Sequence, residues 1–284
     1  VPKIKFGNQP IDGGFLLLTE EERNIAIKSE PFIEKYIRKF VGSVEFINNI
    51  PRYCLWLKDS DPTEIRRSNF LTERLKNVRA FRENSTRKET RELANIPAQF
   101  AFISHCDSEY IIIPSVSSER RRYIPIDFMP KHVIASNLCL IIPGAKLYHF
   151  GILTSEMHMG WVKNICGRLK SDFRYSNSVV YNTFPWPENP LEKHVKAIET
   201  AAQKVLDARL QFPNSSLADL YDPLTMPPAL VKAHHELDKA VDMAYRSQPF
   251  TNEANRMVFL FELYEKYTAN LFTKPKKMKN KRKV

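Results

Sequence analysis

The sequence predicts an α+β fold, in which a domain with a mixed, mostly antiparallel sheet and a long basic helix precedes a small all-α helical domain. Short runs typical of β-strands, separated by turn signals, fill residues 97–185. A long segment with helical spacing precedes them at 61–92, and residues 188–272 have helical periodicity throughout. With 284 residues and 43% hydrophobic composition, the chain is large enough for two such units.

The first expected element is a short helix over residues 20–29. Asp12-Gly13-Gly14 indicates a turn, and Thr19-Glu20-Glu21-Glu22 has the residue types of a helix N-terminal cap. Residues 44–58 are rich in aromatic and branched side chains and contain a proline, so we expect a pair of strands there. The chain starts at Val1 in mid-pattern and looks truncated.

A long basic helix is expected from residue 61 to about residue 92. Asp61-Pro62-Thr63-Glu64 supplies a capping acceptor, a proline at the first helical position and a carboxylate in the first turn. Its apolar face contains Leu71, Leu75, Val78 and Phe81. The remaining surface is rich in arginine and lysine, including Arg79, Arg82 and Lys88. This pattern fits a helix lying along a phosphate backbone, or a solvated surface helix with ion pairs between successive turns.

Five short strands are expected in the sheet region, at residues 99–103, 110–116, 123–128, 138–142 and 147–153. The connection between the second and the third carries three consecutive arginines, Arg120, Arg121 and Arg122. Guanidinium groups bind phosphate oxygens well, but neighbouring residues of a strand point to opposite faces. At most two of these arginines can therefore serve one surface.

Charged and other residues alternate between positions 168 and 175. In an extended strand, this alternation places Arg168, Lys170, Asp172 and Arg174 on one face. Lysine and arginine match the guanine edge and aspartate accepts from the cytosine amino group, so Lys170 and Asp172 fit the two sides of one G·C pair. The alternative is a surface ion network in which Asp172 pairs with Lys170 and Arg174, which contributes little energy.

The remaining segment is expected to contain three helices, at 190–211, after Pro227-Pro228, and at 257–271. Three tryptophans, Trp56, Trp161 and Trp186, have apolar neighbours and fit a core position better than base stacking. The expected organisation is a lead-in (1–22), a recognition domain (23–187), a helical domain (188–272) and a basic disordered tail (273–284).

The net charge of +11 favours a polyanionic partner. Seven of the positive charges lie in residues 274–284, while residues 1–187 have a net charge of +7 (27 Lys/Arg against 20 Asp/Glu) and residues 188–273 a net charge of −3 (9 against 12). The tail fits a solubilising segment as well as one that adds phosphate affinity. The sequence has no apolar run of about 18 residues and no signal-peptide pattern, so we expect a cytoplasmic protein without membrane contact.

The chain lacks the motifs of a self-sufficient enzyme. It has no glycine-rich turn for S-adenosylmethionine, no Asn-Pro-Pro-Tyr loop for a flipped adenine and no phosphate-binding loop. Its four cysteines form no C-x-x-C pair, and its seven histidines show no H-x-x-x-H spacing. We therefore expect no catalytic residue, metal site or cofactor within these residues.

Seven ordered strings resemble the MmeI-like family of fused adenine-specific DNA methyltransferase and restriction enzymes, from its target-recognition domain to its C-terminus. They cover nearly the whole chain apart from the basic tail. The strings are DGG at 12–14, IRKFVGSVEF at 37–46, RYCLWL at 52–57, PSVSSERRRYIP at 114–125, YHFGILTSEMHMGWVKNICGRLKSDFRYSN at 148–177, VYNTFPWP at 180–187 and LADLYDPLTMPP at 217–228.

The resemblance implies a module that recognises double-stranded DNA sequence and works with a methyltransferase domain outside these residues. S-adenosylmethionine is then expected in that domain, and residues 1–22 lead in from it. Within the family, positions in the 168–174 stretch are thought to set base choice, which makes Lys170, Asp172 and Arg174 the expected base readers. The expected DNA-backbone contacts are Arg79, Arg82, Lys88, Arg120, Arg121, Arg122 and Arg168. A protein-interaction scaffold without DNA readout is the alternative.

Overall fold

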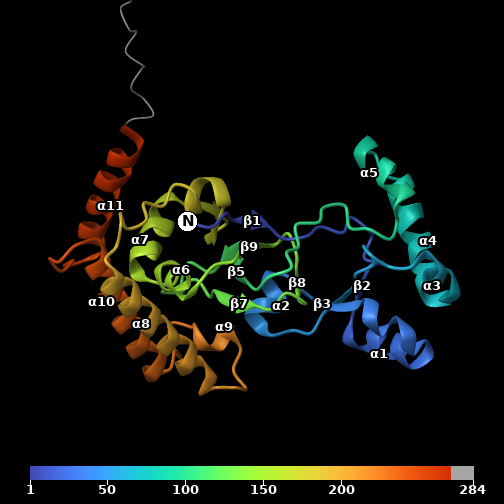
Figure 1. Cartoon of the computed structure of the whole chain (residues 1–284), viewed down its shortest axis with the longest axis horizontal. Coiled ribbons are helices and arrows are strands. Elements are labelled where there is room, and N and C mark those ends of the chain that lie inside the picture. Colours follow the sequence, from blue (N-terminus) through green and yellow to red (C-terminus); the bar gives the residue numbers. More distant parts are fainter. Residues whose placement is uncertain (270–284) are drawn as a thin grey trace, which may run out of the picture.

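A computed structural model describes residues 1–269 of the chain (Figure 1). The molecule is elongated. Helices α1 (Glu20–Ser29), α3 (Pro62–Arg67), α4 (Asn69–Glu83) and α5 (Lys88–Glu92) lie at one end, and the C-terminal helices lie at the other. The basic tail expected at 273–284 lies outside the described residues. The α+β class with a C-terminal helical part is confirmed.

The sheet of the first end contains β2 (Leu17–Leu18), β3 (Ile37–Val41), β4 (Tyr53–Leu55) and β8 (Ile134–Ala135) in the order β2-β4-β3-β8. The pairing is antiparallel except between β3 and β8. Two 3-10 segments, η1 (Pro31–Tyr36) and η2 (Leu93–Asn95), complete this end. Its core packs the sheet against the apolar face of α4. The short helix α2 (Ser43–Asn48) lies in the middle of the molecule (Figure 1), where Phe46 and Ile47 share a separate core cluster with Tyr110 and Ile141.

A central sheet in the order β1-β9-β5-β7 connects this end to the rest of the molecule. Its strands are β1 (Lys5–Phe6), β5 (Tyr110–Pro114), β7 (Asp127–Met129) and β9 (Cys139–Pro143), all antiparallel. All of β5 and most of β9 are buried, which explains their nearly continuous apolar sequence. Gly7 follows β1 where a side chain would lie 2.2 Å from the Ser136 carbonyl oxygen. This close approach requires glycine.

A third, smaller sheet has the order β10-β11-β6, formed by β6 (Val116–Ser117), β10 (Gly167–Leu169) and β11 (Asp172–Arg174). Its strands β10 and β11 follow α7 (Glu156–Ile165), which follows α6 (Leu147–Leu153), whereas β6 comes earlier in the chain. A π-helical turn, η3 (Asn177–Tyr181), leads from β11 towards the C-terminal helices. The C-terminal helices are α8 (Glu192–Leu210), α9 (Leu217–Leu220), α10 (Pro228–Tyr245) and α11 (Glu253–Thr268).

The C-terminal helices share one hydrophobic core with the central sheet and with α6 and α7. Ile111 and Trp161 belong to the same buried cluster as Ile198 and Leu237. Gly151 in α6 allows the close approach of α8, because a side chain there would lie 2.6 Å from Cγ2 of Ile198. The recognition part and the helical part are therefore packed as one body in this structure.

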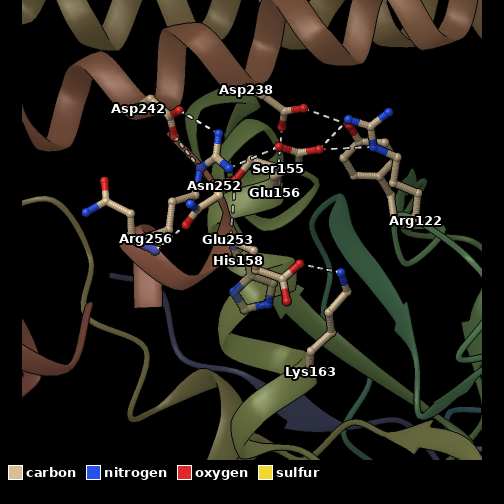
Figure 2. Close-up of polar contacts among 12 residues, drawn as sticks. Arg122, Ser155, Glu156, His158, Lys163, Asp238, Asp242, Asn252, Glu253 and Arg256 are labelled. Atoms are coloured by element: carbon tan, nitrogen blue, oxygen red, sulfur yellow. Dashed lines mark hydrogen bonds and ion pairs between the residues drawn. The ribbon is translucent and has the colours of Figure 1, made fainter. Parts of the chain in front are cut away.

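A polar network crosses the same junction (Figure 2). The Arg256 guanidinium on α11 forms ion pairs with Asp242 on α10 at 2.7 Å and with Glu156 on α7 at 3.2 Å. Glu156 also accepts from Nε of Arg122 at 3.0 Å, and its backbone N–H donates to Asp238 at 2.7 Å. The network fixes α7, α10 and α11 relative to one another.

Two expectations for the N-terminal half are wrong in detail. The helix expected over 61–92 is divided into α3, α4 and α5, because the Ser68 hydroxyl caps a new helix by accepting from the Leu71 N–H at 3.0 Å. Residues 44–58 contain helix α2 and strand β4 instead of two strands. Glu45 caps α2 by accepting from the Gly42 N–H at 3.1 Å, which stabilises the helical start.

Three expected strands of the sheet region also differ. Residues 147–153 form helix α6, whose buried residues face other elements and therefore give an apolar run without alternation. Residues 99–103 form only a single bridge, between Gln9 and Phe102. In the 123–128 range only the end is extended, as β7, while Tyr123 and Ile124 fill the core from an irregular segment. The helix expected at 20–29, the strands near 110 and 139, and three C-terminal helices are confirmed.

Candidate nucleic-acid interface

The stretch that holds the expected base readers is a hairpin. Strands β10 and β11 are antiparallel, with Leu169 opposite Asp172 and Gly167 opposite Arg174. Lys170 and Ser171 therefore form a two-residue connection, and Lys170 adopts a left-handed conformation with a φ of 55°. The turn places the Lys170 side chain at the tip of the hairpin, where it is exposed.

The hairpin corrects the expectation of one continuous strand face. Asp172 and Arg174 share a face of β11, but Arg168 lies opposite Phe173 on the other face of the hairpin. The Arg168 guanidinium lies 4.2 Å from the centre of the Phe173 ring and 3.3 Å from the Glu119 carboxylate. Lys170 stands at the turn, next to the face that carries Asp172 and Arg174.

The three expected readers are not joined in a surface ion network. Within residues 1–269, neither Lys170 nor Arg174 forms an ion pair with Asp172. Lys170 and Arg174 are exposed, and Asp172 is half-buried. Asp172 lies near Arg121: burial lowers the pKa of the Arg121 guanidinium, and the negative charges of Asp172 and Asp222 oppose that shift. The polar groups of the hairpin that a partner could approach are therefore not neutralised by one another.

A groove of about 1000 Å³ runs beside the hairpin and includes Arg174 and Gly167 in its lining. Its other polar contributors include Lys5, Ser115 and Asn137. Apolar side chains stand at its border, and Phe6 and Phe102 are 47% and 62% exposed. Sequence reasoning missed these lining residues because they come from four separate segments.

The three consecutive arginines take three different positions. Arg120 is exposed, Arg121 is half-buried and Arg122 is bound by Glu156. The Arg122 guanidinium also lies 5.4 Å from the centre of the Tyr123 ring. Nε of Arg121 is buried without a hydrogen-bond partner among the described residues. Arg120 is therefore the member of this run whose side chain is freely presented, while Arg122 belongs to the network of the helical junction.

Arg82 is a correction, because its side chain is structural. It is 0% exposed and donates to the backbone carbonyls of five residues at 2.7 to 3.0 Å. These carbonyls belong to Pro10, Ile11, Leu93, Ile96 and Gln99. A buried guanidinium with this set of partners joins helix α4 to two loops and cannot reach a phosphate. Burial lowers its pKa, and the negative charge of Asp12 opposes that shift.

Arg79 and Lys88 are exposed but lie apart from the hairpin. They belong to α4 and α5, at the opposite end of the long axis from α7, which leads into the hairpin (Figure 1). Lys88 lies 3.9 Å from Glu92 one turn later. The structure therefore does not gather these two residues with Arg168, Lys170 and Arg174.

Two of the tryptophans expected in the core are buried there, Trp56 and Trp161, and Trp186 is half-buried. Within residues 1–269, no group of three or more His, Cys, Asp or Glu side chains is placed to hold a metal ion. No helix in the same range is both long and apolar enough to cross a bilayer.

An exposed polar hairpin beside a groove, on a body with a continuous core, is typical of a macromolecular recognition domain. The comparisons give the family. A family model described as the MmeI target recognition domain matches residues 1–188, and one described as the MmeI C-terminal domain matches residues 191–272. The chain therefore belongs to the MmeI family, and the resemblance seen in its sequence is confirmed.

Two relatives give the scale of the similarity. DNA methyltransferase A of Bacillus subtilis (strain 168) is 44% identical over 268 residues, which is 94% of this chain and 30% of that protein. The solved structure of the Type IIL restriction-modification enzyme MmeI in complex with DNA is 50% identical, with a TM-score of 0.92. That match covers 95% of this chain and 36% of the MmeI chain. The chain thus spans about a third of the length of these relatives.

Proposed function

We propose that this chain recognises a specific sequence in double-stranded DNA on behalf of an adenine-specific methyltransferase and restriction enzyme. The observation that carries the proposal is the β10–β11 hairpin of an MmeI target recognition domain. Among the described residues, Lys170, Asp172 and Arg174 of this hairpin form no ion pairs with one another. A two-stranded β-ribbon fits the major groove of B-form DNA. Relatives matched over this region include an MmeI structure solved with DNA.

The chemistry of the three side chains suggests how bases are distinguished. The Lys170 ammonium donates to O6 and N7 of guanine, and the Asp172 carboxylate accepts from the amino group of the paired cytosine. Arg174 can donate to a neighbouring guanine from the same face of β11. Exposed cations such as Arg120 and Arg168 add contacts to phosphate, which position the hairpin without reading sequence.

Catalysis is assigned to the part of the enzyme outside these residues. The chain has eight glycines and no glycine-rich turn or Asn-Pro-Pro-Tyr loop, so its own residues do not fit S-adenosylmethionine or a flipped adenine. The methyltransferase domain would hold that cofactor, which supplies the methyl group. The chain would orient the DNA so that one adenine of the motif faces that domain.

A selection from a library of random duplexes tests the proposal directly. The 284-residue chain should enrich a single asymmetric motif that contains adenine and at least one G·C pair. Its affinity for that duplex should fall steeply between about 50 and 200 mM salt, because phosphate contacts release counterions. Absence of salt-sensitive duplex binding would show the protein-interaction scaffold instead. Sequencing of methylated adenines in cells that carry the complete gene should return the same motif.

A further inference from the structure

Lysine and arginine side chains line a second groove, away from the hairpin. It has a volume of about 520 Å³ and lies between the η1–β3 segment and the loop before β8. Arg38, Lys39 and Lys131 line it, together with Lys35 and His132. The carboxylates at this groove are those of Glu34 and Asp107. The Glu34 carboxylate is already paired with Arg23 at 3.3 Å.

The loop around His105 connects this groove to the groove beside the hairpin. Phe102 to Ser104 line the first groove, and Asp107 lines the second. The His105 ring packs edge-on against Trp56, with ring centres 5.4 Å apart. Burial lowers the pKa of the His105 imidazole, and the positive charges of Arg38, Lys5 and Lys58 lower it further, while Asp107 opposes them. These three cations are therefore close enough to the loop to act on its imidazole, and Lys5 also lines the groove that contains Arg174.

We define the basic strip as Lys5, Arg38, Lys39, Lys58 and Lys131. None of its members forms an ion pair within residues 1–269, whereas the neighbouring Lys35 is paired with Glu64. Lys39, Lys58 and Lys131 are exposed, and Lys5 and Arg38 are half-buried. Like charges held near one another without ion-pair partners repel, and a polyanion that binds them relieves this repulsion.

The position of the basic strip favours duplex DNA over other polyanions. The first groove carries Arg174 of the proposed reader face and Lys5 of the strip, so the strip begins where the hairpin meets the bases. A duplex that places its bases at the hairpin continues past it, with one negative charge per about 1.7 Å of its axis. Phosphates beyond the bases that are read would then meet a surface that supplies cations.

We propose that the basic strip binds the phosphate backbone of the DNA duplex to one side of the bases read by the hairpin. The proposal rests on the proposed function, and it moves the main backbone contact from helices α4 and α5 to the segments that carry the strip. Its lysines would position the duplex and would contribute equally to the affinity for duplexes of any sequence.

The test replaces the three exposed lysines of the strip together, in a Lys39→Ala, Lys58→Ala, Lys131→Ala variant of the chain. A matched control replaces three exposed lysines of α8 and α10, in a Lys193→Ala, Lys232→Ala, Lys239→Ala variant. Both variants lose the same net charge. Circular dichroism and thermal unfolding first establish that each variant keeps its fold.

Duplex affinity is then measured from about 50 to 200 mM salt, with the selected motif and with a scrambled duplex. The strip variant should lower the slope of log K against log salt by about 2 to 3, since each lost phosphate contact removes about 0.9. The strip variant should lower the affinity for both duplexes by the same factor, about tenfold or more at low salt. The control variant should keep the slope of the unmodified chain.

Three results would overturn the inference. Equal slopes in the strip variant and the control would show that these lysines do not contact phosphate. A loss confined to the selected motif would show that they read bases. If the unmodified chain itself binds no duplex, the proposed function fails, and the inference fails with it. The first two results leave the proposed function standing.

Discussion

Lys170 lies in the hairpin turn and Asp172 begins the strand after it, and their charges should decide the preferred base pair. Exchange of the two charges, in a Lys170→Glu, Asp172→Arg variant, places the acceptor where the donor was. We expect the selected motif to change at one G·C pair, where guanine should now be preferred on the opposite strand. The other positions should keep their base. A repeat of the duplex selection measures this. An unchanged motif would show that the two residues do not read bases and have a structural role instead.

Arg168 is the matched control for this exchange, because it points to the other face of the same hairpin. An Arg168→Gln variant removes one positive charge and the stacking on Phe173. We expect this variant to bind all duplexes more weakly by a similar factor and to select the same motif as the unmodified chain. A changed base preference in this variant would contradict the assignment of the two hairpin faces.

Arg82 is expected to matter for stability and not for DNA contact. An Arg82→Met variant keeps the side-chain length but leaves the Ile11 and Gln99 carbonyls without their donor, while the Pro10, Leu93 and Ile96 carbonyls still accept from a backbone N–H. We expect the free energy of unfolding to fall by about 2 kcal/mol or more, because each unsatisfied carbonyl in the interior costs about 1–3 kcal/mol. Urea unfolding measures it. The exposed neighbour in an Arg79→Met variant should change stability by less than about 0.5 kcal/mol.

The role of Arg82 could have been predicted in part from its position. It follows Leu71, Leu75 and Val78 at helical spacing, and these four are the buried residues of α4. Phe81, which was expected on that face, is 44% exposed. The spacing therefore marks Arg82 as buried, but the five carbonyls that bind it come from loops whose path the spacing does not specify. The hairpin turn at Lys170 was missed for a similar reason, since alternation alone cannot distinguish one strand from two short ones.

At the scale of elements, two helical glycines provide a matched test of packing. A Cβ on Gly151 in α6 would lie 2.6 Å from Cγ2 of Ile198, whereas one on Gly160 in α7 would meet nothing closer than 3.4 Å. We expect a Gly151→Ala variant to lose about 1–3 kcal/mol of stability, because α6 and α8 must move apart. A Gly160→Ala variant should be neutral or gain up to about 1 kcal/mol from helix propensity. Equal effects in urea unfolding would contradict the close packing.

Asp238 on α10 should make the helical junction sensitive to pH. Burial raises the pKa of the Asp238 carboxyl from 3.8 to about 7, and the charge of Glu156 adds to the shift. Hydrogen bonds from the Tyr123 hydroxyl and the Glu156 N–H, and the positive charge of Arg122, oppose it. Because the folded chain holds this proton more tightly than the unfolded chain, the stability it contributes is full below pH 4 and is lost as the pH rises through 7.

An Asp238→Asn variant removes this titration while it keeps a neutral side chain of the same shape. The asparagine oxygen can accept from the Glu156 N–H, and its amide can donate to the Tyr123 hydroxyl. We expect the unfolding free energy of the variant, relative to the unmodified chain, to rise with pH between about 4 and 7. The slope is at most about 1.4 kcal/mol per pH unit. Urea unfolding at several pH values measures it, and parallel curves would contradict the raised pKa.

The elements that sequence reasoning assigned wrongly share a physical cause. Residues 147–153 are a short apolar run, and such a run fits a buried helix as well as a buried strand. Helix α1 and the C-terminal helices were predictable because each is amphipathic or carries a clear cap, as Thr19 does for α1. The break before α4 depends on Ser68, whose capping acceptor lies within a pattern that otherwise continues as a helix.

At the scale of the whole molecule, the described residues contain two large cores. One lies at the end with α1 and α3–α5, and the other joins the central sheet to the C-terminal helices. Composition and periodicity indicated a sheet region followed by helices, but they gave no information on which helices pack against which strands. That arrangement depends on long-range contacts, such as Ile198 of α8 against α6. The family resemblance supplied the function, and the structure supplies the rigid connection between its two parts.

The continuous core predicts that the recognition part and the helical part unfold together. A Leu237→Ala variant removes a fully buried side chain of α10 and should cost about 2–5 kcal/mol. Trp161 on α7 reports on the recognition part and lies in the same core. In a Trp56→Phe, Trp186→Phe background, Trp161 is the remaining tryptophan.

The Trp161 fluorescence transition in urea should then move to a lower midpoint by the full amount that circular dichroism gives for the helices. A Leu224→Ala variant is the matched control, because Leu224 is 82% exposed and the same atoms are removed. Its midpoint should stay within error of the background. If Leu237→Ala lowers the helical transition and leaves the Trp161 midpoint in place, the two parts unfold independently. The hairpin would then be held by the recognition part alone, and the helical part would not be needed to keep the readers in position.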